Sequence, residues 1–399
     1  MQWMRESAIG IYISVPFCRS KCTYCNFASG VYPASAHAGY VERLLEDMEG
    51  SAKWAAGMGL HLPREVDTVY LGGGTPSLLE PELIARLLAA LSSRFHLAPD
   101  AEITMECAPG QLPQAVLDAM VAAGVNRVSL GVQSFIDTEA HSSGRLHNRA
   151  MVADDVRRLR AAGIHNVNLD LIAGLAGQTF DSWDESLSVL LDCGVPHASV
   201  YMLEVDEESR LGREMLAGGA RYRAGLVPSD DAIARMYETA VMTLESAGLK
   251  QYEISNFALP GFESRHNLRY WERRPYLGLG LDASSMLPAS EGDDVLRATT
   301  TDDLQVYLAG GQAPEAEWLC PDRQLEEAWF LGLRKNSGVD PNALAREFGR
   351  DLAEVSLDVA ERLERDGSLT REAGWFRLSS RGRMISNDVF QEFLLDGSS

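Results

Sequence analysis

Tyr12-Ile-Ser-Val-Pro-Phe-Cys-Arg-Ser-Lys-Cys-Thr-Tyr-Cys-Asn-Phe27 carries a strand-like run straight into three closely spaced cysteines, Cys18, Cys22 and Cys25. Their spacing is C-x3-C-x2-C. Three thiolates on one tight loop can hold three irons of a 4Fe-4S cluster, whereas clusters that only carry electrons are normally closed by a fourth cysteine. Because no fourth cysteine lies nearby, the sequence predicts a cluster with one open iron.

Two other uses of cysteine compete with this interpretation. A structural zinc site needs four Cys or His ligands, and no second ligand pair follows downstream. A disulfide framework is disfavoured because the chain has only 6 cysteines in 399 residues and its start does not resemble a secretory signal. The remaining cysteines, Cys107, Cys193 and Cys320, occur singly in apolar or element-end surroundings, where we expect buried, inert thiols.

Composition limits the class of protein. A chain of 399 residues that is 46% hydrophobic can bury a large core and is expected to form two or three domains. No run of about 18 apolar residues predicts a membrane span. Free thiols and an oxygen-sensitive cluster suit a reduced cytoplasm, where we expect the protein. The net charge of -21 argues against nucleic acid as a partner, because nucleic-acid binding relies on clustered Lys and Arg.

Short β-branched runs alternate with longer helical patterns along the first half of the chain. The expected strands are residues 9–15, 68–71, 102–106, 127–132, 166–171 and 198–205. The expected helices between them are residues 36–56, 80–95, 113–123, 148–162 and 180–193. Six β-α units in succession predict an α/β fold in which a parallel sheet curves into a partial (β/α)6 TIM-like barrel.

Polar and glycine residues follow the predicted strands, at the end of a barrel where chemistry is usually placed. The second strand leads into Gly72-Gly73-Gly74-Thr75-Pro76-Ser77, where the backbone can approach a ligand without a Cβ in the way. Glu106, Gln133 and Asp170 lie at or near the ends of the next three strands. A tight turn explains the glycines equally well, and Glu106 and Gln133 could instead cap neighbouring helices.

These motifs together carry a resemblance. The cysteine loop, GGGTPS, ITMEC, GVQSF, NLDLIAGLAGQT and YEISNFALPGFESRHNLRYW occur in this order over essentially the whole chain. The chain is thereby similar to the radical S-adenosylmethionine (SAM) superfamily, to its coproporphyrinogen-oxidase-like group, and within that group to the HemW heme chaperones.

The resemblance implies a cofactor pocket. Cys18, Cys22 and Cys25 would ligate the cluster, and SAM would chelate the open iron before an electron from the cluster cleaves it to a 5′-deoxyadenosyl radical. The residues implied to contact SAM or complete its pocket are Gly73, Gly74, Thr75, Tyr12, Tyr24, Glu106, Gln133, Arg145 and Asp170. Tyr12 is equally suited to be a core aromatic residue on a central strand.

Departures from the family patterns separate its subgroups. Coproporphyrinogen oxidases carry a further cysteine two positions after the third, where this chain has Phe27, and a long N-terminal arm, where only 17 residues precede Cys18. Both departures argue against decarboxylation of coproporphyrinogen. Ala176, where proline is usual, and Cys107-Ala108, where Ala-Asn is usual, remove no implied ligand.

The segment His266-Asn-Leu-Arg-Tyr270-Trp271 matches the HNxxYW pattern of the heme chaperones. The resemblance implies that His266, Tyr270 and Trp271 contact heme, since imidazole is a common axial ligand and aromatic rings can flank a porphyrin. Guanidinium groups suit heme propionates, and four arginines lie in the same stretch: Arg265, Arg269, Arg273 and Arg274. Alternatively, His266 and Trp271 cover the open side of the barrel and the arginines pair with carboxylates.

After Trp271 the pattern changes. Residues 274–285 are expected to form a turn near the active site, and residues 288–303 a polar stretch. Helical patterns at residues 323–334, 341–348 and 352–366, a hairpin at 367–379 and a final helix to about Leu395 predict a mostly helical, winged-helix-like domain. Arg377, Arg381 and Arg383 are mixed there with acidic residues, so we expect a lid or partner-docking module rather than a DNA-binding one.

The predicted domains are residues 1–205, a radical SAM partial barrel; 206–315, a barrel extension with the heme-contacting segment; and 316–399, the winged-helix-like domain.

We therefore expect a heme chaperone that binds a 4Fe-4S cluster, SAM and heme, and transfers heme to acceptor proteins. Transient docking to a membrane or to respiratory proteins is compatible with that role, and no motif predicts the oligomeric state. The alternative is a radical SAM enzyme that acts on a porphyrin, or a radical SAM methyltransferase.

Overall fold

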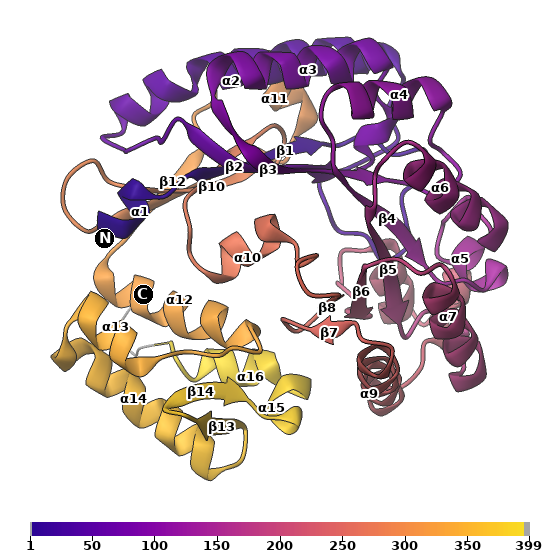
Figure 1. Ribbon diagram of the computed structural model, residues 1–399. Coiled ribbons are helices and arrows are strands. Elements are labelled where there is room, and N and C mark those ends of the chain that lie inside the picture. The colour runs from indigo at the N-terminus through magenta and orange to yellow at the C-terminus, as the bar shows by residue number, and fades with distance from the viewer. Residues whose placement is uncertain (1, 395–399) are drawn as a thin grey trace.

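The computed structural model describes residues 2–394, and a curved twelve-stranded sheet forms its centre (Figure 1). The six strands of the central part are parallel and adjacent in chain order. They are β1 (Ile9–Val15), β2 (Glu65–Gly73), β3 (His96–Cys107), β4 (Arg127–Gln133), β5 (Asn166–Ala173) and β6 (His197–Met202). Within the described residues β1 and β6 do not pair, so the barrel is open, as predicted for a partial (β/α)6 barrel.

Helices cover the outer face of this sheet (Figure 1). The crossover helices are α2 (Ser35–Gly57), α3 (Pro81–Arg94), α4 (Gln114–Ala122), α6 (Arg149–Ala161) and α7 (Phe180–Asp192), and α9 (Asp230–Ser246) follows β6. Shorter helices are α1 (Gln2–Glu6), η1 (Pro76–Leu78), α5 (Asp137–Ser142), α8 (Arg210–Leu216) and η2 (Arg221–Leu226). The five predicted crossover helices are confirmed to within about two residues at each end, which is the usual uncertainty of helix termini.

Short strands that the sequence analysis missed extend the sheet at both edges. On one side β9 (Tyr276–Leu279) runs parallel to β1 and is followed by antiparallel β10 (Ser284–Pro288), β11 (Val295–Thr299) and β12 (Glu315–Leu319). On the other side lie β8 (Asn256–Ala258) and β7 (Lys250–Gln251). The predicted turn at 274–285 is therefore partly a strand. Strands of two to five residues give too little alternation to be recognised from sequence.

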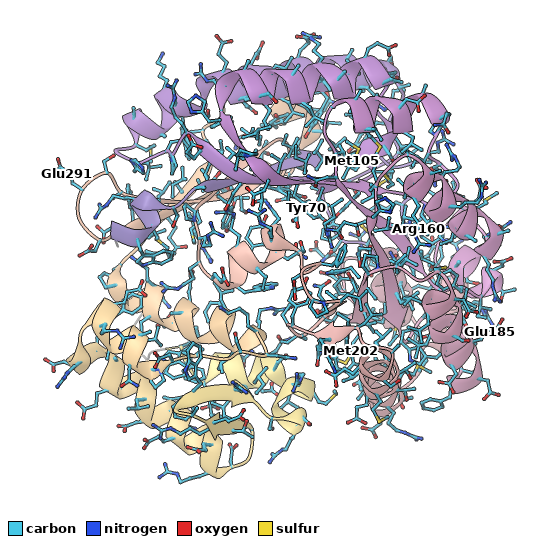
Figure 2. The ribbon with its side chains drawn as sticks, viewed as in Figure 1. Tyr70, Met105, Arg160, Glu185, Met202 and Glu291 are labelled. Atoms are coloured by element: carbon cyan, nitrogen blue, oxygen red, sulfur yellow. The ribbon has the colours of Figure 1, made fainter. Side chains whose placement is uncertain are left out.

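Side chains alternate across the barrel wall. On β1, Ile11 and Ile13 are fully buried in the apolar core shared with the covering helices, whereas Tyr12 faces inward and stacks on Tyr70 with ring centroids 6.1 Å apart. Figure 2 shows Tyr70 on the inner side of the sheet and Arg160 on the outer helices. The inner face is largely polar, unlike the branched apolar filling of a closed barrel. It is this polar interior that positions the candidate site.

Helix α10 (Arg265–Trp271) lies in the hollow of the curved sheet, between β2 and the C-terminal helices (Figure 1). The C-terminal part has its own hydrophobic cluster, in which the rings of Trp329 and Phe393 stack at 4.8 Å. Its elements, with the preceding α11 (Leu304–Ala309), are α12 (Pro321–Arg334), α13 (Pro341–Phe348), α14 (Arg350–Arg365), β13 (Leu369–Glu372), β14 (Trp375–Leu378), α15 (Ser380–Met384) and α16 (Ser386–Gln391). The predicted three helices and hairpin are present in this part of the chain. The domain boundaries stay a prediction.

For two elements, the sixth strand and the final helix, the predicted bounds differ from the structure. The sixth strand ends at Met202 rather than at 205, because residues 203–206 leave the sheet to line a cavity. The expected final helix is two short helices, α15 and α16, with a break at Ile385, and Leu395 lies outside the described residues. Every helix within residues 2–394 is too short or too polar to cross a bilayer.

Candidate functional site

A cavity of about 620 Å³ opens at the carboxyl ends of the barrel strands. Most of the residues that the resemblance assigned to the cofactors line it, although they come from six separate chain segments. These residues are Cys18, Cys22, Tyr24, Cys25, Gly73, Gly74, Thr75, Glu106, Gln133, Arg145 and Asp170. The cavity therefore brings together the predicted cluster ligands and almost all of the predicted SAM pocket.

The cysteine loop is held in place by backbone hydrogen bonds to three other segments. The amide of Cys18 donates to the carbonyl of Gly30 at 2.8 Å, and the amide of Thr23 donates to the carbonyl of Ser143 at 3.0 Å. The amide of Leu211, in the first turn of α8, donates to the carbonyl of Thr23 at 2.8 Å. The loop thus has a fixed shape, with its thiols directed to the cavity.

The three loop thiols are free and lie in a partly buried, polar setting. Burial raises the pKa of Cys18, and hydrogen bonds from Ser29 and Thr75 oppose that shift. Arg145 Nη1 donates to the sulfur of Cys22 at 3.4 Å. In residues 2–394 no three His, Cys, Asp or Glu side chains gather closely enough to share one ion. Three cysteines suit the three protein-bound irons of a cluster, whereas a structural zinc site takes four ligands.

The glycine loop lies directly against the end of β1. A Cβ atom on Gly74 would lie 2.7 Å from the carbonyl oxygen of Val15 and 2.8 Å from that of Phe17. Gly73 has a φ of +90°, a conformation that favours glycine. The amide of Thr75 donates to the carbonyl of Phe17 at 2.8 Å. These contacts require glycine at both positions and fix the loop beside the cysteines.

Two carboxylates face the cavity from β3 and β5. The hydroxyl of Tyr70 donates to Glu106 at 2.8 Å. Burial raises the pKa of Glu106 to about 7; the Tyr70 hydrogen bond opposes this shift and the charge of Asp170 adds to it. Burial also raises the pKa of Asp170, which accepts hydrogen bonds from Asn168 at 2.6 Å and from Ser129 at 3.2 Å. The two carboxylates are poised to accept further donors from a ligand.

Gln133 and Arg145 complete this wall. The backbone of Gln133 has a φ of +70°, which is rare for a residue with a side chain, and its buried Oε1 has no partner within residues 2–394. Arg145 is fixed by a hydrogen bond to the carbonyl of Gly131. An unpartnered acceptor in a cavity wall is what a ligand with donor groups requires. The residues present therefore fit a cluster with SAM beside it.

Tyr12 is not among the residues that line the cavity. Its hydroxyl lies beneath Gly73, where a Cβ on that glycine would come within 3.3 Å. Its ring packs against Tyr70, and against His266 at 6.5 Å between ring centroids. The structure thus gives Tyr12 a packing role under the glycine loop, and direct cofactor contact stays a prediction.

Other lining residues were missed. Tyr201 projects into the cavity from the end of β6, and Ser129 and Cys107 also line it. The available signal for Ser129 was its place on the same face of β4 as Gln133, four residues further along the strand. The expectation for single cysteines was wrong for Cys320, which is exposed because it directly precedes Pro321 at the surface start of α12. Phe27, in place of a fourth cysteine, is 64% exposed on the rim.

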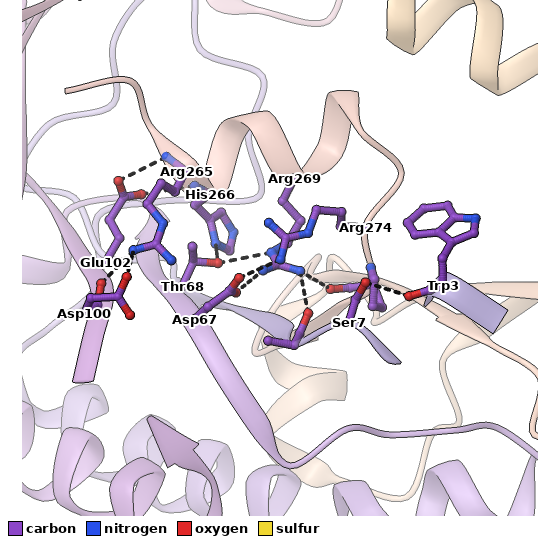
Figure 3. Close-up of polar contacts among 12 residues, drawn as sticks. Trp3, Ser7, Asp67, Thr68, Asp100, Glu102, Arg265, His266, Arg269 and Arg274 are labelled. Atoms are coloured by element: carbon purple, nitrogen blue, oxygen red, sulfur yellow. Dashed lines mark hydrogen bonds and ion pairs between the residues drawn. The ribbon is translucent and has the colours of Figure 1, made fainter. Parts of the chain in front are cut away.

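His266 lies outside the cavity, on α10 (Figure 3). The side chain is 0% exposed, and both ring nitrogens are engaged, Nδ1 with Thr68 Oγ1 and Nε2 with the hydroxyl of Tyr270, each at 2.9 Å. Burial and the charge of Arg269 lower the pKa of His266 to about 3, so the ring is neutral. Iron ligation by His266 would require one of these hydrogen bonds to be exchanged.

The four arginines around α10 all pair with carboxylates, as Figure 3 shows for three of them. Arg269 and Arg274 share Asp67, the latter at 2.7 Å. The other two pairs are Arg265 with Asp100 at 3.3 Å and Arg273 with Glu347 at 2.9 Å. The alternative that the arginines pair within the protein therefore describes this structure, and no guanidinium of the four is held free for a propionate.

Trp271 lies at the end of α10, next to the C-terminal part of the chain. The guanidinium of Arg334, on α12, lies 4.3 Å from the centre of its ring, and its Nε1 has no partner among residues 2–394. At the other end of the helix, Glu102 accepts hydrogen bonds from the amides of Arg265 and His266 at 3.0 and 3.1 Å. Helix α10 is thus secured at both ends.

Comparison with known proteins agrees with this arrangement. Residues 12–190 match the family described as Radical SAM superfamily, and residues 319–385 match the HemN C-terminal domain. The heme chaperone HemW of Lactococcus lactis is 33% identical over 98% of this chain and 99% of its own. The heme chaperone HemW of Escherichia coli is 30% identical over 97% of this chain and 98% of its own.

Among solved structures, coproporphyrinogen III oxidase (HemN) from Escherichia coli matches with a TM-score of 0.82, covering 98% of this chain and 90% of that one. At 22% identity this likeness concerns the fold alone. Because relatives at 30% identity or more extend along almost its whole length, the chain belongs to the HemW heme chaperone family of the radical SAM superfamily.

Proposed function

We propose that the chain is a cytoplasmic heme chaperone: it holds a 4Fe-4S cluster and SAM in the barrel cavity, binds heme, and passes heme to acceptor proteins. The observation that carries the proposal is the cavity itself, which unites three free thiols with a glycine loop and buried polar groups on successive strand ends. The names of the relatives supply the heme part.

Each group in the cavity has a role in this proposal. The thiols of Cys18, Cys22 and Cys25 would hold three irons, which leaves the fourth for the amino and carboxylate groups of SAM. The unpartnered Oε1 of Gln133 and the carboxylate of Asp170 would accept hydrogen bonds from SAM. When bound, the cluster and SAM would together supply an iron that SAM chelates and a sulfonium that an electron can cleave.

Heme is proposed to contact α10 through His266, Tyr270 and Trp271. Since both nitrogens of His266 already have hydrogen-bond partners, ligation would replace the bond from Tyr270 or from Thr68. Heme binding at this place therefore involves a movement of α10 or of the residues that cover it.

The test uses the full chain, reconstituted with iron and sulfide without oxygen. We expect a visible cluster absorbance, SAM binding in equilibrium dialysis, a Soret shift on titration with heme, and transfer of heme to an apo-cytochrome. Incubation of the reduced protein with SAM and coproporphyrinogen should give 5′-deoxyadenosine without protoporphyrinogen. Absence of heme binding, or efficient formation of protoporphyrinogen, would contradict the chaperone proposal.

The complete cofactor cavity favours one second candidate, a radical SAM enzyme that acts on a porphyrin or transfers a methyl group. In that case the same incubation would convert the tetrapyrrole, and the products would identify the reaction. Conversion in step with 5′-deoxyadenosine would select this candidate.

A further inference from the structure

The carboxylate of Glu106 depends on one side chain for its hydrogen bonding. The hydroxyl of Tyr70, on β2, donates to Glu106 Oε1 at 2.8 Å, and no other side chain of residues 2–394 donates to this carboxylate. Strands β2 and β3 are parallel neighbours in which Tyr70 pairs with Thr104, so Glu106 lies two residues closer to the cavity than Tyr70 does. Tyr70 therefore supports the carboxylate from below, while Glu106 itself lines the cavity.

The ring of Tyr70 is held in place by packing as well as by this hydrogen bond. It packs against Tyr12 on β1, with ring centroids 6.1 Å apart, and against His266 on α10, at 5.3 Å. His266 is itself fixed through both of its ring nitrogens. A hydroxyl that is placed by such packing sets the direction of the carboxylate to which it donates.

Gly72, the first glycine of the loop, leaves room for this pair. A Cβ atom on Gly72 would lie 2.9 Å from Cε1 of Tyr70 and 3.0 Å from the carboxyl carbon of Glu106. The backbone of Gly72 is not in the left-handed region, so the requirement for glycine at this position is one of space. Any side chain here would push against both partners of the hydrogen bond at once.

The same hydrogen bond governs the proton of Glu106. Burial raises the pKa of Glu106 to about 7, and the Tyr70 hydrogen bond is the strongest influence that lowers it. Burial and the charge of Glu106 raise the pKa of Tyr70, so the phenol keeps its proton and is the donor. Donation to a carboxylate favours its ionised form, so loss of the hydroxyl should move the titration of Glu106 to higher pH.

Other charged and titratable groups face Glu106 from the surrounding elements. The charge of Asp170 raises the pKa of Glu106, whereas the charge of Arg145 and the backbone amide of Gly73 lower it. The remaining groups are neutral phenols whose own pKa is raised by burial and, to a smaller extent, by Glu106; they are Tyr12, Tyr201 and Tyr270. Among these groups the side chain that touches the carboxylate is that of Tyr70.

Asp170, the second carboxylate of the cavity, is supported differently. It accepts hydrogen bonds from Asn168 at 2.6 Å and from Ser129 at 3.2 Å, so the loss of one donor leaves another in place. Glu106 has no such second side-chain donor within residues 2–394. A change at Tyr70 should therefore act on Glu106 and leave Asp170 oriented.

We propose that Tyr70 is a positioning residue that holds Glu106 as an ionised acceptor directed at the cavity ligand, and that Gly72 provides the space for this pair. The inference rests on the proposed function, since it takes SAM as the cavity ligand. Tyr70 is not among the residues that line the cavity, so its influence on the ligand passes through Glu106.

The first experiment follows the proton of Glu106 in the full chain without cofactors. Infrared spectra recorded across a pH titration show the C=O band of the protonated carboxyl, which is assigned by its absence in Glu106→Gln. Tyr70→Phe should move the disappearance of this band to higher pH. The control is Tyr237→Phe, which removes another buried phenol hydroxyl, one that bonds Gln251 and the carbonyl of Ile254, and should leave the band unchanged.

The second experiment measures SAM affinity against pH with the oxidised, cluster-loaded full chain, so that SAM is not cleaved. Tyr70→Phe should weaken SAM binding by about tenfold at about pH 7, which is what the loss of one hydrogen bond to a charged group produces. The loss should be smaller at about pH 9, where Glu106 is ionised in both proteins. In a Glu106→Gln background, Tyr70→Phe should have no further effect.

A second variant keeps the test decisive if Tyr70→Phe folds poorly. Gly72→Ala places a methyl group between Tyr70 and Glu106, so it should shift the infrared titration and the pH profile of SAM affinity in the same direction. Gly39→Ala on α2 is its control, because a Cβ atom there meets nothing within 4 Å, and it should change neither profile.

The outcomes separate this inference from the proposed function. An infrared titration that is unchanged in both Tyr70→Phe and Gly72→Ala would overturn the positioning role. A loss of SAM affinity that is equal at every pH, or that persists in the Glu106→Gln background, would also overturn it, because the hydroxyl would then act by another route. Failure of the wild-type chain to bind SAM would instead contradict the proposed function, and the infrared titration would still decide whether Tyr70 controls Glu106.

Discussion

The two ends of the barrel interior are both polar, yet they are organised in opposite ways. At the cavity end, groups such as Gln133 Oε1 and the thiols of the cysteine loop have few protein partners and face open space. At the α10 end, His266 and Arg269 are 0% exposed and fully engaged with neighbouring residues. The first end is arranged to receive a ligand as it stands, and the second is closed on itself.

This difference indicates at which end of the barrel ligand binding requires a rearrangement of the protein. Unpartnered polar groups gain hydrogen bonds when a ligand arrives, so ligand binding at the cavity costs little reorganisation. Paired and buried groups must first lose their partners, which costs about 1–3 kcal/mol for each group left unsatisfied. The variants described below disrupt the cavity end or the α10 end, and their effects test the difference between the two.

The largest effect is expected at the cluster loop. Cys22→Ser replaces a predicted cluster ligand whose sulfur also accepts a hydrogen bond from Arg145. Loss of one of three ligands should abolish the visible cluster absorbance and the bound iron after reconstitution, while far-UV circular dichroism stays unchanged. Cys193→Ser is the matched control, because this thiol is free and lies outside the cavity. A normal iron content in Cys22→Ser would show that other ligands hold the metal.

The next largest effect is expected at the closed end. Arg269→Met removes the buried charge that pairs with Asp67 and the donor to the carbonyls of Ala8 and Pro275, so the free energy of unfolding should fall by about 3–5 kcal/mol. Chemical denaturation of the cofactor-free chain measures this free energy of unfolding. Arg265→Met removes a more exposed pair with Asp100 and should cost about 0–1 kcal/mol. Equal losses in the two variants would contradict the closed, buried character of α10.

The fold was predictable where one signal repeats over many residues. Strand β1 and helix α13 have the predicted bounds, because a β-branched run and a Pro-led apolar pattern each fix a local structure. Strand β2 begins at Glu65 rather than at 68, since pairing with β3 rather than its own composition recruits the first residues. The edge strands depend on such pairing entirely, which no local pattern reveals.

The candidate site divides in the same way. The cavity residues follow successive strands, so the order of the motifs was enough to predict that they meet. The setting of α10 could not be predicted, because Asp67 and Glu102 lie far from it in the chain. Three of the four arginines that were considered for heme propionates are bound or supported by these carboxylates, and Arg273 pairs with Glu347. Long-range charge pairing leaves no mark on the local sequence.

A smaller effect is expected at the glycine loop. Gly74→Ala places a methyl group against the backbone of Val15 and Phe17, which cannot move as a side chain can. The loop should shift, at a cost of about 1–3 kcal/mol in stability, and SAM binding should weaken accordingly. Gly50→Ala on α2, where a Cβ meets nothing within 4 Å, should instead stabilise the chain by about 0.5–1 kcal/mol. Unchanged SAM affinity in Gly74→Ala would mean that the loop does not contact the ligand.

The smallest effect is a pH dependence at Glu106. Burial raises its pKa to about 7 in the folded chain, above the usual value of about 4.3. A carboxyl group that binds its proton more tightly in the folded state contributes stability that is complete below its ordinary pKa and lost as the pH rises through about 7. Glu106→Gln stays neutral, so its stability relative to wild type should improve from about pH 5 to about pH 8.

Ligand binding should show the opposite sign for the same group. In the proposed function an ionised Glu106 would accept hydrogen bonds from SAM, so wild-type SAM affinity should rise by up to about tenfold between about pH 6 and about pH 8, a change that one pKa unit of preference produces. Glu106→Gln should flatten this rise, and Glu185→Gln on the exposed face of α7 should keep it. Parallel pH profiles for the Glu106→Gln variant and wild type would place the titrating group elsewhere, with Asp170 next in line because burial raises its pKa too. The open end of the barrel would then depend on β5 rather than on β3 for its charge.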